Sequence, residues 1–275
     1  MPFSPPATVP PSLKHTCISC PSPGILLVLI NRPQKLNSLT VEASYELDKI
    51  FQWFDNTPNL HVAILSGVGR IFCAGADLKE WAANNKKGFP LDFPANGFGG
   101  ISMRQGKKPI IAAVNGPAYG GGFEMVVNCD LVIASPAATF TLPEVKRGVV
   151  ALAGSLPRLM RQIGKQRATE LALTGRTATA HELRDWGLCN LIVEEGVGVV
   201  DEAIRVAKTI VDNSPDAVVI TRDGLKLGWE ALSADDASRA FLGGSSKRIY
   251  HGDNIQEGLT AFQERRPPRW KESKL

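Results

Sequence analysis

The chain has 275 residues, of which 44% are hydrophobic and 21% are charged, as is typical of a globular protein. Its 31 basic and 27 acidic residues leave a formal charge of +4. That charge is too small to indicate a nucleic-acid-binding protein, although it suits a phosphorylated small ligand. Five cysteines are an odd number in a chain of this length and do not indicate the disulfide framework of a small secreted domain.

Residues 1–12 are rich in proline and lack the basic and apolar regions of a signal peptide. We expect them to form a flexible lead. The longest apolar run, residues 25–30, is far shorter than the roughly twenty residues that cross a bilayer. The sequence therefore predicts no membrane partner.

Residues 13–30 are expected to form a β-hairpin. Its first strand alternates, its turn lies at residues 21–24, and its second strand, residues 25–30, is buried. Cys17 and Cys20 form one C-x-x-C motif, but no second pair follows at zinc spacing. They alternate with neighbouring side chains as in an ordinary strand, which we favour over a redox or metal site. The four histidines are isolated from one another, so no metal site is predicted.

A helix is predicted from Thr40, its N-cap, through Phe54, because Leu47, Ile50 and Phe51 share one apolar face with Phe54. Short strands are predicted at residues 61–65, 110–114 and 130–134, with a helix starting within residues 120–124. Strand and helix alternate at short spacing, so we expect one α/β core.

After about residue 155 the pattern becomes mostly helical. The helix over residues 197–211 has an apolar face that includes Val199, Val206 and Ile210. We expect that a single core does not fully cover this face, which predicts contact with other subunits. The predicted division is a lead at 1–12, a core at 13–195, a helical C-terminal part at 196–270 and a tail at 271–275.

Small residues gather in residues 72–78, directly after a predicted strand and turn. Ala74, Gly75 and Ala76 let the backbone approach a ligand closely and leave amides free to donate. By itself such a run is more often a simple tight turn.

Two further segments carry carboxylates. Residues 115–124 contain three consecutive glycines at a helix start, where exposed amides and the helix dipole form a seat for an anionic oxygen. Glu124 lies three residues after Gly121, on the same face of the first turn. In residues 140–144 a proline fixes the backbone before Glu144 and could aim it into a cleft. Each glutamate alone fits a plainer role, but the combination around one sheet indicates an active site.

These segments resemble the enoyl-CoA hydratase/isomerase (crotonase) family over about residues 15–270. The motifs in register are Asn31-Arg32-Pro33 with Asn37, Ala74-Gly75-Ala76-Asp77-Leu78, Asn115-Gly116 with Gly120-Gly121-Gly122-Phe123-Glu124, and Pro143-Glu144 with Gly148. The resemblance implies an α/β crotonase-like fold, with a core of repeated ββα units and a helical C-terminal trimerisation part. It also implies trimers, often paired as hexamers.

The resemblance assigns catalysis to Glu124 and Glu144, both glutamates as in the hydratase branch. It implies that the amides of Ala76 and Gly121 form the oxyanion hole, which holds the thioester carbonyl oxygen. It places substrate contacts with coenzyme A at Lys35, Leu36, Ala74, Gly75, Ala76, Asp77, Leu78, Lys79 and Gly121. No separate cofactor and no metal are implied, because coenzyme A is part of the substrate.

We therefore expect an enoyl-CoA hydratase, with Glu124 as the base that positions water and Glu144 as the acid. Both glutamates can hold the same water, so the two labels can be exchanged. An enoyl-CoA isomerase or a non-catalytic acyl-CoA- or RNA-binding member of the fold are the alternatives, and retention of both carboxylates favours the hydratase. Leu152 departs from the family, because hydratases often have glycine there and related isomerases and hydrolases an aspartate. A leucine cannot ionise and should reshape the acyl pocket, whose variable wall we expect at residues 88–100.

The sequence ends in Ser273-Lys274-Leu275, which matches the address read by a peroxisomal import receptor. The basic residues before it, Arg265, Arg266, Arg269 and Lys271, fit a mobile solvated tail or a phosphate contact equally well. A peroxisomal location suits fatty-acid degradation or a side pathway. In this respect the chain is similar to the mevalonyl-CoA hydratases of siderophore synthesis.

Overall fold

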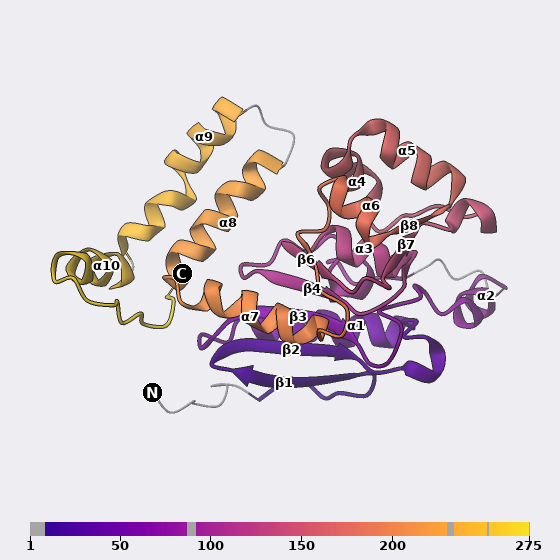
Figure 1. Cartoon of the computed structure of the whole chain (residues 1–275), viewed down its shortest axis with the longest axis horizontal. Coiled ribbons are helices and arrows are strands. Elements are labelled where there is room, and N and C mark those ends of the chain that lie inside the picture. Colours follow the sequence, from indigo (N-terminus) through magenta and orange to yellow (C-terminus); the bar gives the residue numbers. More distant parts are fainter. Residues whose placement is uncertain (1–8, 87–91, 230–233, 252, 275) are drawn as a thin grey trace.

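The main sheet of the computed structural model, which describes residues 9–86, 92–229, 234–251 and 253–274, has six strands (Figure 1). Their order is β1 (Thr16–Ser22), β2 (Gly24–Ile30), β3 (Leu60–Gly67), β4 (Ile110–Val114), β6 (Leu131–Ala134) and β9 (Leu191–Ile192). β1 runs antiparallel to β2, and every later pair is parallel. A second sheet has the order β5 (Ala118–Tyr119), β7 (Thr139–Thr141), β8 (Thr177–Thr179).

The predicted hairpin and the three predicted strands are confirmed as β1 with β2, β3, β4 and β6. β1 contains Cys17 and Cys20, as predicted for an ordinary strand. All residues of β4 and nearly all of β2 are buried, because helices cover both faces of a parallel sheet. The α/β architecture expected from the alternation of elements is therefore confirmed.

One face of the main sheet packs against α1 (Val41–Asp55), whose N-cap is Thr40, as predicted. The Thr40 hydroxyl accepts a hydrogen bond of 3.1 Å from the backbone N–H of Ala43. The predicted apolar face of this helix is buried, with Phe51 and Phe54 at its centre.

The other face packs against α7 (Val199–Val211). Val199 is buried in that layer, and Val206 and Ile210 pack partly buried against it. The sheet of the same chain therefore covers Val199 fully and Val206 and Ile210 only in part, and contact of this face with another subunit remains a prediction. The strands carry a second apolar surface, which includes Ile64 and Ile111, and the helix of the same chain covers it.

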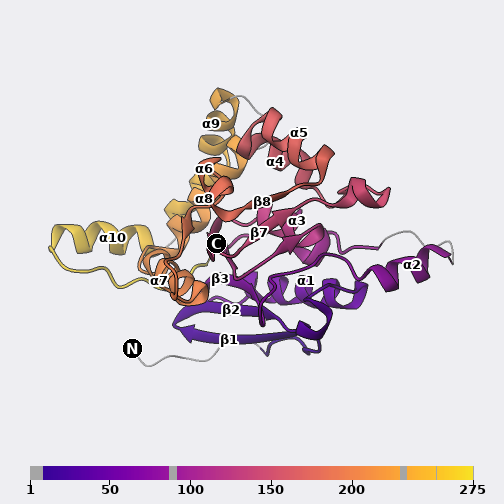
Figure 2. The same cartoon turned by 45° about the vertical axis from the view of Figure 1, so that its right-hand side comes forward.

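The remaining helices surround the strand ends or leave the sheet. They are α2 (Leu78–Lys86), α3 (Gly121–Val127), α4 (Ser155–Ile163), α5 (Lys165–Thr174), α6 (Ala180–Asp185), α8 (Pro215–Trp229), α9 (Ala234–Gly243) and α10 (Asp253–Gln263). Four short 3-10 turns are η1 (Pro33–Lys35), η2 (Phe98–Gly100), η3 (Glu144–Arg147) and η4 (Ser245–His251). Figures 1 and 2 show α8 and α9 side by side and α10 extending away from the sheets. Within the described part of the chain, no helix combines the length and apolarity needed to span a membrane.

The C-terminal tail is bonded to the helices beside it. The Trp270 indole donates to the Asp212 carbonyl at 2.8 Å, and Asn254 exchanges hydrogen bonds of 2.8 and 3.0 Å with the Lys271 backbone. The Ser273 hydroxyl donates to Asp216. These contacts tie the stretch to its neighbouring helices, while Arg265, Arg269 and Lys271 stay exposed to solvent as predicted. Leu275, like residues 1–8 of the predicted lead, lies outside the described residues.

Candidate active site

A pocket with a cavity volume of about 690 Å³ lies where the three predicted segments meet. Its lining includes Ala74, Gly75 and Ala76 from the turn after β3, Gly120, Gly121 and Glu124 from the start of α3, and Glu144 from η3. The parallel pairing of β5 with β7 holds the second and third segments beside each other. β8 pairs antiparallel with the other edge of β7. The structure thus brings both predicted glutamates and both predicted amide sites to one cavity.

Glu124 lies in the first turn of α3 with only 2% of its surface exposed. Its Oε2 atom accepts a hydrogen bond of 3.3 Å from the backbone N–H of Ser155. The pKa of Glu124 is raised to about 7, chiefly by burial and also by the charge of Glu144, against the lowering effect of donors from Ser155 and Ala153. This carboxyl group therefore changes its charge close to neutral pH.

Glu144 begins η3, with Pro143 immediately before it. Its Oε2 atom is buried and has no hydrogen-bond partner among the described residues. Burial raises the pKa of Glu144 as well. A Cβ atom added to Gly120 would lie 3.0 Å from Glu144 Oε1, so the bare backbone at that position lets the carboxyl group sit against the start of α3.

The two predicted amide sites lie close together. Gly75 has a φ of +89°, and a Cβ atom built on it would be 2.8 Å from the Tyr119 carbonyl and 3.4 Å from the Gly121 nitrogen. Only glycine tolerates this φ and this close approach. In the described part of the chain, neither the Ala76 N–H nor the Gly121 N–H donates to another backbone group. Both amides are therefore available to a ligand oxygen.

Some predicted coenzyme-A contacts do not line this pocket. Asp77 instead receives backbone hydrogen bonds from Lys79 and Glu80 at the start of α2 and pairs with Arg32 at 3.4 Å. The Leu36 carbonyl accepts a hydrogen bond of 3.1 Å from the Ala74 N–H, which ties η1 to the turn. Leu78 does line the pocket. The part of Lys35, Leu36, Asp77 and Lys79 in binding coenzyme A remains a prediction.

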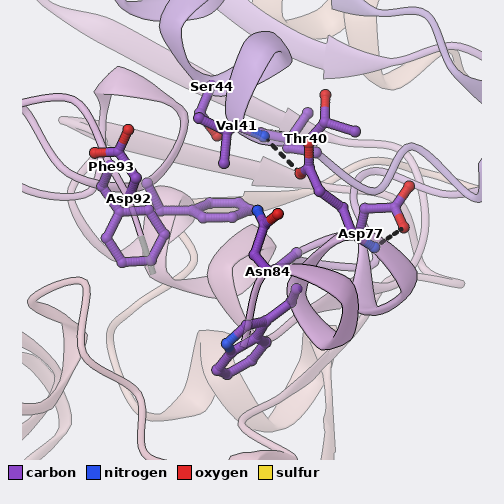
Figure 3. A pocket seen from close by; sticks show the side chains of 12 residues that line it. Thr40, Val41, Ser44, Asp77, Asn84, Asp92 and Phe93 are labelled. Atoms are coloured by element: carbon purple, nitrogen blue, oxygen red, sulfur yellow. Dashed lines mark hydrogen bonds between the residues drawn. The ribbon is translucent and has the colours of Figure 1, made fainter. Parts of the chain in front are cut away.

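A second, smaller cavity lies between α1 and α2, next to the larger pocket (Figure 3). The two cavities share lining residues that include Ala76, Trp81 and Phe98. Glu80, which also lines the smaller cavity, accepts a hydrogen bond of 2.8 Å from the Val41 N–H. Its volume of about 20 Å³ has room for roughly one water molecule. The larger pocket is therefore the one that can admit a thioester.

Several lining residues were not predicted as site residues. Trp81 contributes an apolar wall, and Lys146 and Arg147 add positive charge. The basic pair lies two and three residues after Glu144 on the same 3-10 turn, a signal that was readable in the sequence. Of the expected wall at residues 88–100, Phe93 and Phe98 line the pocket, while residues 88–91 fall outside the described structure.

Leu152, the residue that departs from the family pattern, lines the pocket and is 64% exposed. Its side chain is therefore free to touch an acyl group. Across the ranges that the structure describes, no three His, Cys, Asp or Glu side chains are grouped so that they could hold a metal ion.

Comparison with known proteins agrees with this geometry. The family described as enoyl-CoA hydratase/isomerase matches residues 21–273. A mevalonyl-coenzyme A hydratase of Aspergillus fumigatus is 49% identical, over 96% of this chain and 98% of that protein. One from Beauveria bassiana is 47% identical, over 97% and 98%. A solved enoyl-CoA hydratase, EchA1 of Mycobacterium marinum, superposes with a TM-score of 0.85 at 36% identity, over 93% and 98% of the two chains. The chain belongs to the enoyl-CoA hydratase/isomerase family.

Proposed function

We propose that the chain is a coenzyme-A hydro-lyase that adds water to a 2-enoyl thioester and, in reverse, dehydrates a 3-hydroxyacyl thioester. The observation that carries this proposal is the pairing of Glu124 and Glu144 in one cavity, both with raised pKa values. Adding water requires one group that accepts a proton and one that donates it. Two carboxyl groups whose pKa values are raised by burial can share these roles.

The free amides suit the charge that forms during this reaction. Attack of water at the β-carbon moves electrons onto the thioester oxygen and gives an enolate. Donors at Ala76 and Gly121 would stabilise that oxygen, and losing one such donor typically costs about 3 kcal/mol of transition-state stabilisation. Glu124 then takes a proton from the attacking water, and Glu144 delivers one to the α-carbon. The two glutamates can exchange these roles because both can hold the same water.

Mevalonyl-CoA is the first substrate to test, because two relatives of 49% and 47% identity carry the name mevalonyl-coenzyme A hydratase. The pocket lining mixes apolar residues such as Leu152 and Val150 with the hydroxyl-bearing Thr141 and Thr177. Such a lining suits a short acyl group that carries its own hydroxyl. Because Leu152 cannot ionise, it also disfavours the related chemistries that need a third carboxylate at this position.

The test is turnover of mevalonyl-CoA and a panel of other 3-hydroxyacyl and 2-enoyl thioesters, followed by the absorbance of the conjugated thioester. Glu124→Gln and Glu144→Gln keep the shape of each side chain but remove its ability to ionise. For a hydratase, each change lowers kcat at least about a hundredfold with thioester affinity nearly unchanged.

The double variant distinguishes the alternatives. In a hydratase the kcat of the double variant falls by much less than the product of the two single-variant decreases, because the carboxylates act on one water as a unit. An isomerase that works through Glu144 alone keeps most of its activity in Glu124→Gln. A protein that only binds acyl-CoA shows no turnover in any form. Hydration that is insensitive to Glu124→Gln would overturn the proposal.

We further propose that the chain assembles as a trimer or hexamer. Beside the partly covered face of α7, the support comes from large apolar side chains that α8, α9 and α10 leave exposed, namely Leu225, Leu242, Leu259 and Phe262. Phe262 alone is 85% exposed, and contact with another subunit would remove such apolar surface from water. Light scattering at micromolar concentration should give a trimeric or hexameric mass, and a monomeric mass would contradict this proposal.

Finally, we propose that Ser273-Lys274-Leu275 directs the protein to the peroxisome through an import receptor. The proposal rests on the match of this tripeptide to the peroxisomal address.

A further inference from the structure

Ser155 is the first residue of α4, and its side chain is completely buried next to the Glu124 carboxyl group. Its backbone N–H donates to Glu124 Oε2 at 3.3 Å. A hydrogen bond from its hydroxyl is among the causes that lower the pKa of Glu124, although the hydroxyl does not reach the full geometry of a hydrogen bond with any described group. Two donors of one residue therefore face the same carboxyl group, the amide in a hydrogen bond and the hydroxyl in a weaker contact.

A poorly aligned hydroxyl at a buried position is unfavourable, because burial removes it from water without a full hydrogen bond in exchange. A serine hydroxyl can turn about its χ1 bond, and its proton can rotate to meet an acceptor. An ionised Glu124 would be the stronger acceptor, since hydrogen bonds to charged oxygens are shorter and stronger than those to neutral ones. The Ser155 hydroxyl is therefore suited to bond the carboxylate once Glu124 has lost its proton.

Besides a backbone hydrogen bond from Ala153, which also lowers the pKa of Glu124, the surroundings leave this task to Ser155. Glu144 acts on Glu124 from η3 and opposes its ionisation. Arg158, the nearest cation along α4, is turned to Asn128 Oδ1 at 2.8 Å and to the Gly154 carbonyl at 2.9 Å. Lys146 and Arg147 of η3 line the same pocket. No ion pair reaches Glu124 within the described ranges.

We propose that Ser155 is a positioning residue, whose amide and hydroxyl together hold the ionised Glu124 carboxylate toward the pocket and favour its charged form. This role rests on the proposed function, in which an ionised Glu124 positions the attacking water. Ser155 acts through Glu124 and needs no contact with the substrate itself.

The direct test is an infrared titration of the full chain, following the protonated carboxyl band that disappears in Glu124→Gln. In the unmodified chain this band should titrate near pH 7. In Ser155→Ala the titration should move upward by about half a pH unit or more, the size expected when a carboxylate loses one hydrogen-bond donor. Ser155→Gly removes the same hydroxyl, keeps the amide and should give the same direction, which guards against a packing effect of one variant.

Ser102→Ala is the matched control. Ser102 is also fully buried with an unpartnered hydroxyl, but it is not among the groups that act on either glutamate. This control should leave the titration of Glu124 in place. The acid limb of the pH profile of kcat/KM for hydration should follow the infrared titration in the Ser155 variants and stay fixed in the control.

The outcomes separate the two proposals. An unchanged titration of Glu124 in both Ser155 variants overturns the role of Ser155. A uniform loss of kcat at every pH, with no movement of the acid limb, also overturns it, because a purely structural effect would do that. The infrared titration needs no turnover, so an inactive wild-type chain would count against the hydratase alone.

Discussion

The Glu124 carboxyl group is held where its negative charge is unfavourable. It is 2% exposed, and burial raises its pKa from the ordinary 4.5 to about 7. A raised pKa in the folded chain means that the native state holds this proton more tightly than the unfolded state does. The stability that the protonated group contributes is fully present below about pH 4.5 and is lost as the pH rises through about 7.

This linkage predicts a pH-dependent effect of Glu124→Gln on stability. Glutamine is uncharged at every pH, so the variant escapes the penalty that the native chain meets above pH 7. Its melting temperature relative to the wild type should be higher at pH 8 than at pH 5. Between these two pH values the free energy of unfolding of the variant should gain up to about 3 kcal/mol relative to the wild type, because the pKa is displaced by roughly two and a half units.

Glu182→Gln is a control with the opposite sign. The Glu182 carboxylate accepts from the Thr179 backbone and side chain and pairs with Arg176, and these contacts lower its pKa. Its stabilisation is present above its ordinary pKa and lost as the pH falls. Glu182→Gln should therefore lose stability relative to wild type as the pH rises from 4 to 8. Parallel melting curves for both variants across this range would contradict the assignment of a raised pKa to Glu124.

At the level of elements, the turn that ends in Ala76 depends on Gly75. A side chain at this residue would be strained by the φ of +89° and would also meet the Tyr119 carbonyl at 2.8 Å. Gly187 has nearly the same φ, +87°, but a Cβ atom there would have nothing within 4 Å. Substitutions at both glycines strain the backbone, but only a substitution at Gly75 also disturbs the close approach of the turn to α3. Comparing the two therefore separates these effects.

Gly75→Ala and Gly187→Ala should both lose about 1 kcal/mol of stability from the positive φ. Only Gly75→Ala should also lower kcat, by around a hundredfold, because the shifted turn misaims the Ala76 amide. Chemical unfolding and steady-state kinetics on both variants measure the two effects. If Gly187→Ala lost the same activity, or Gly75→Ala kept full activity, the Ala76 amide would not be part of an oxyanion hole.

The elements that follow from local patterns could be predicted from the sequence. Helix α1 is set by its Thr40 cap and its apolar face, and the strands by short apolar runs. The two glutamates and the glycine turns were identified because they lie within short motifs. The contact of Ser155 with Glu124 joins residues 31 positions apart in the sequence. No local pattern reports such a contact, and for the same reason the packing of α7 on its own sheet was missed.

At the scale of the whole molecule, residues 270–274 are bonded to the helices beside them, and the proposed import address would have to leave these contacts before a receptor could bind it. Asn254 is 1% exposed and joins the Lys271 backbone, while Asp216 receives the Ser273 hydroxyl. Lys274 pairs with Asp253 at 2.8 Å, and both side chains are exposed. An exposed pair of this kind contributes little, so the hydrogen bonds of Asn254, Trp270 and Ser273 account for most of the retention.

This arrangement predicts how the proposed import address behaves. Asn254→Ala removes both hydrogen bonds to Lys271, so the tail should be released more easily. Its affinity for the tripeptide-binding domain of a peroxisomal import receptor should rise about fivefold to tenfold, the equivalent of one or two such bonds. Asp253→Ala, which removes the two exposed pairs of Asp253 with Lys271 and Lys274, should change it less than about threefold. A chain shortened before Ser273 should keep its activity and stay in the cytosol. Entry of the shortened chain into peroxisomes would show that the tripeptide is not the address, and equal affinities of Asn254→Ala and wild type would show that the tail contacts do not restrain it.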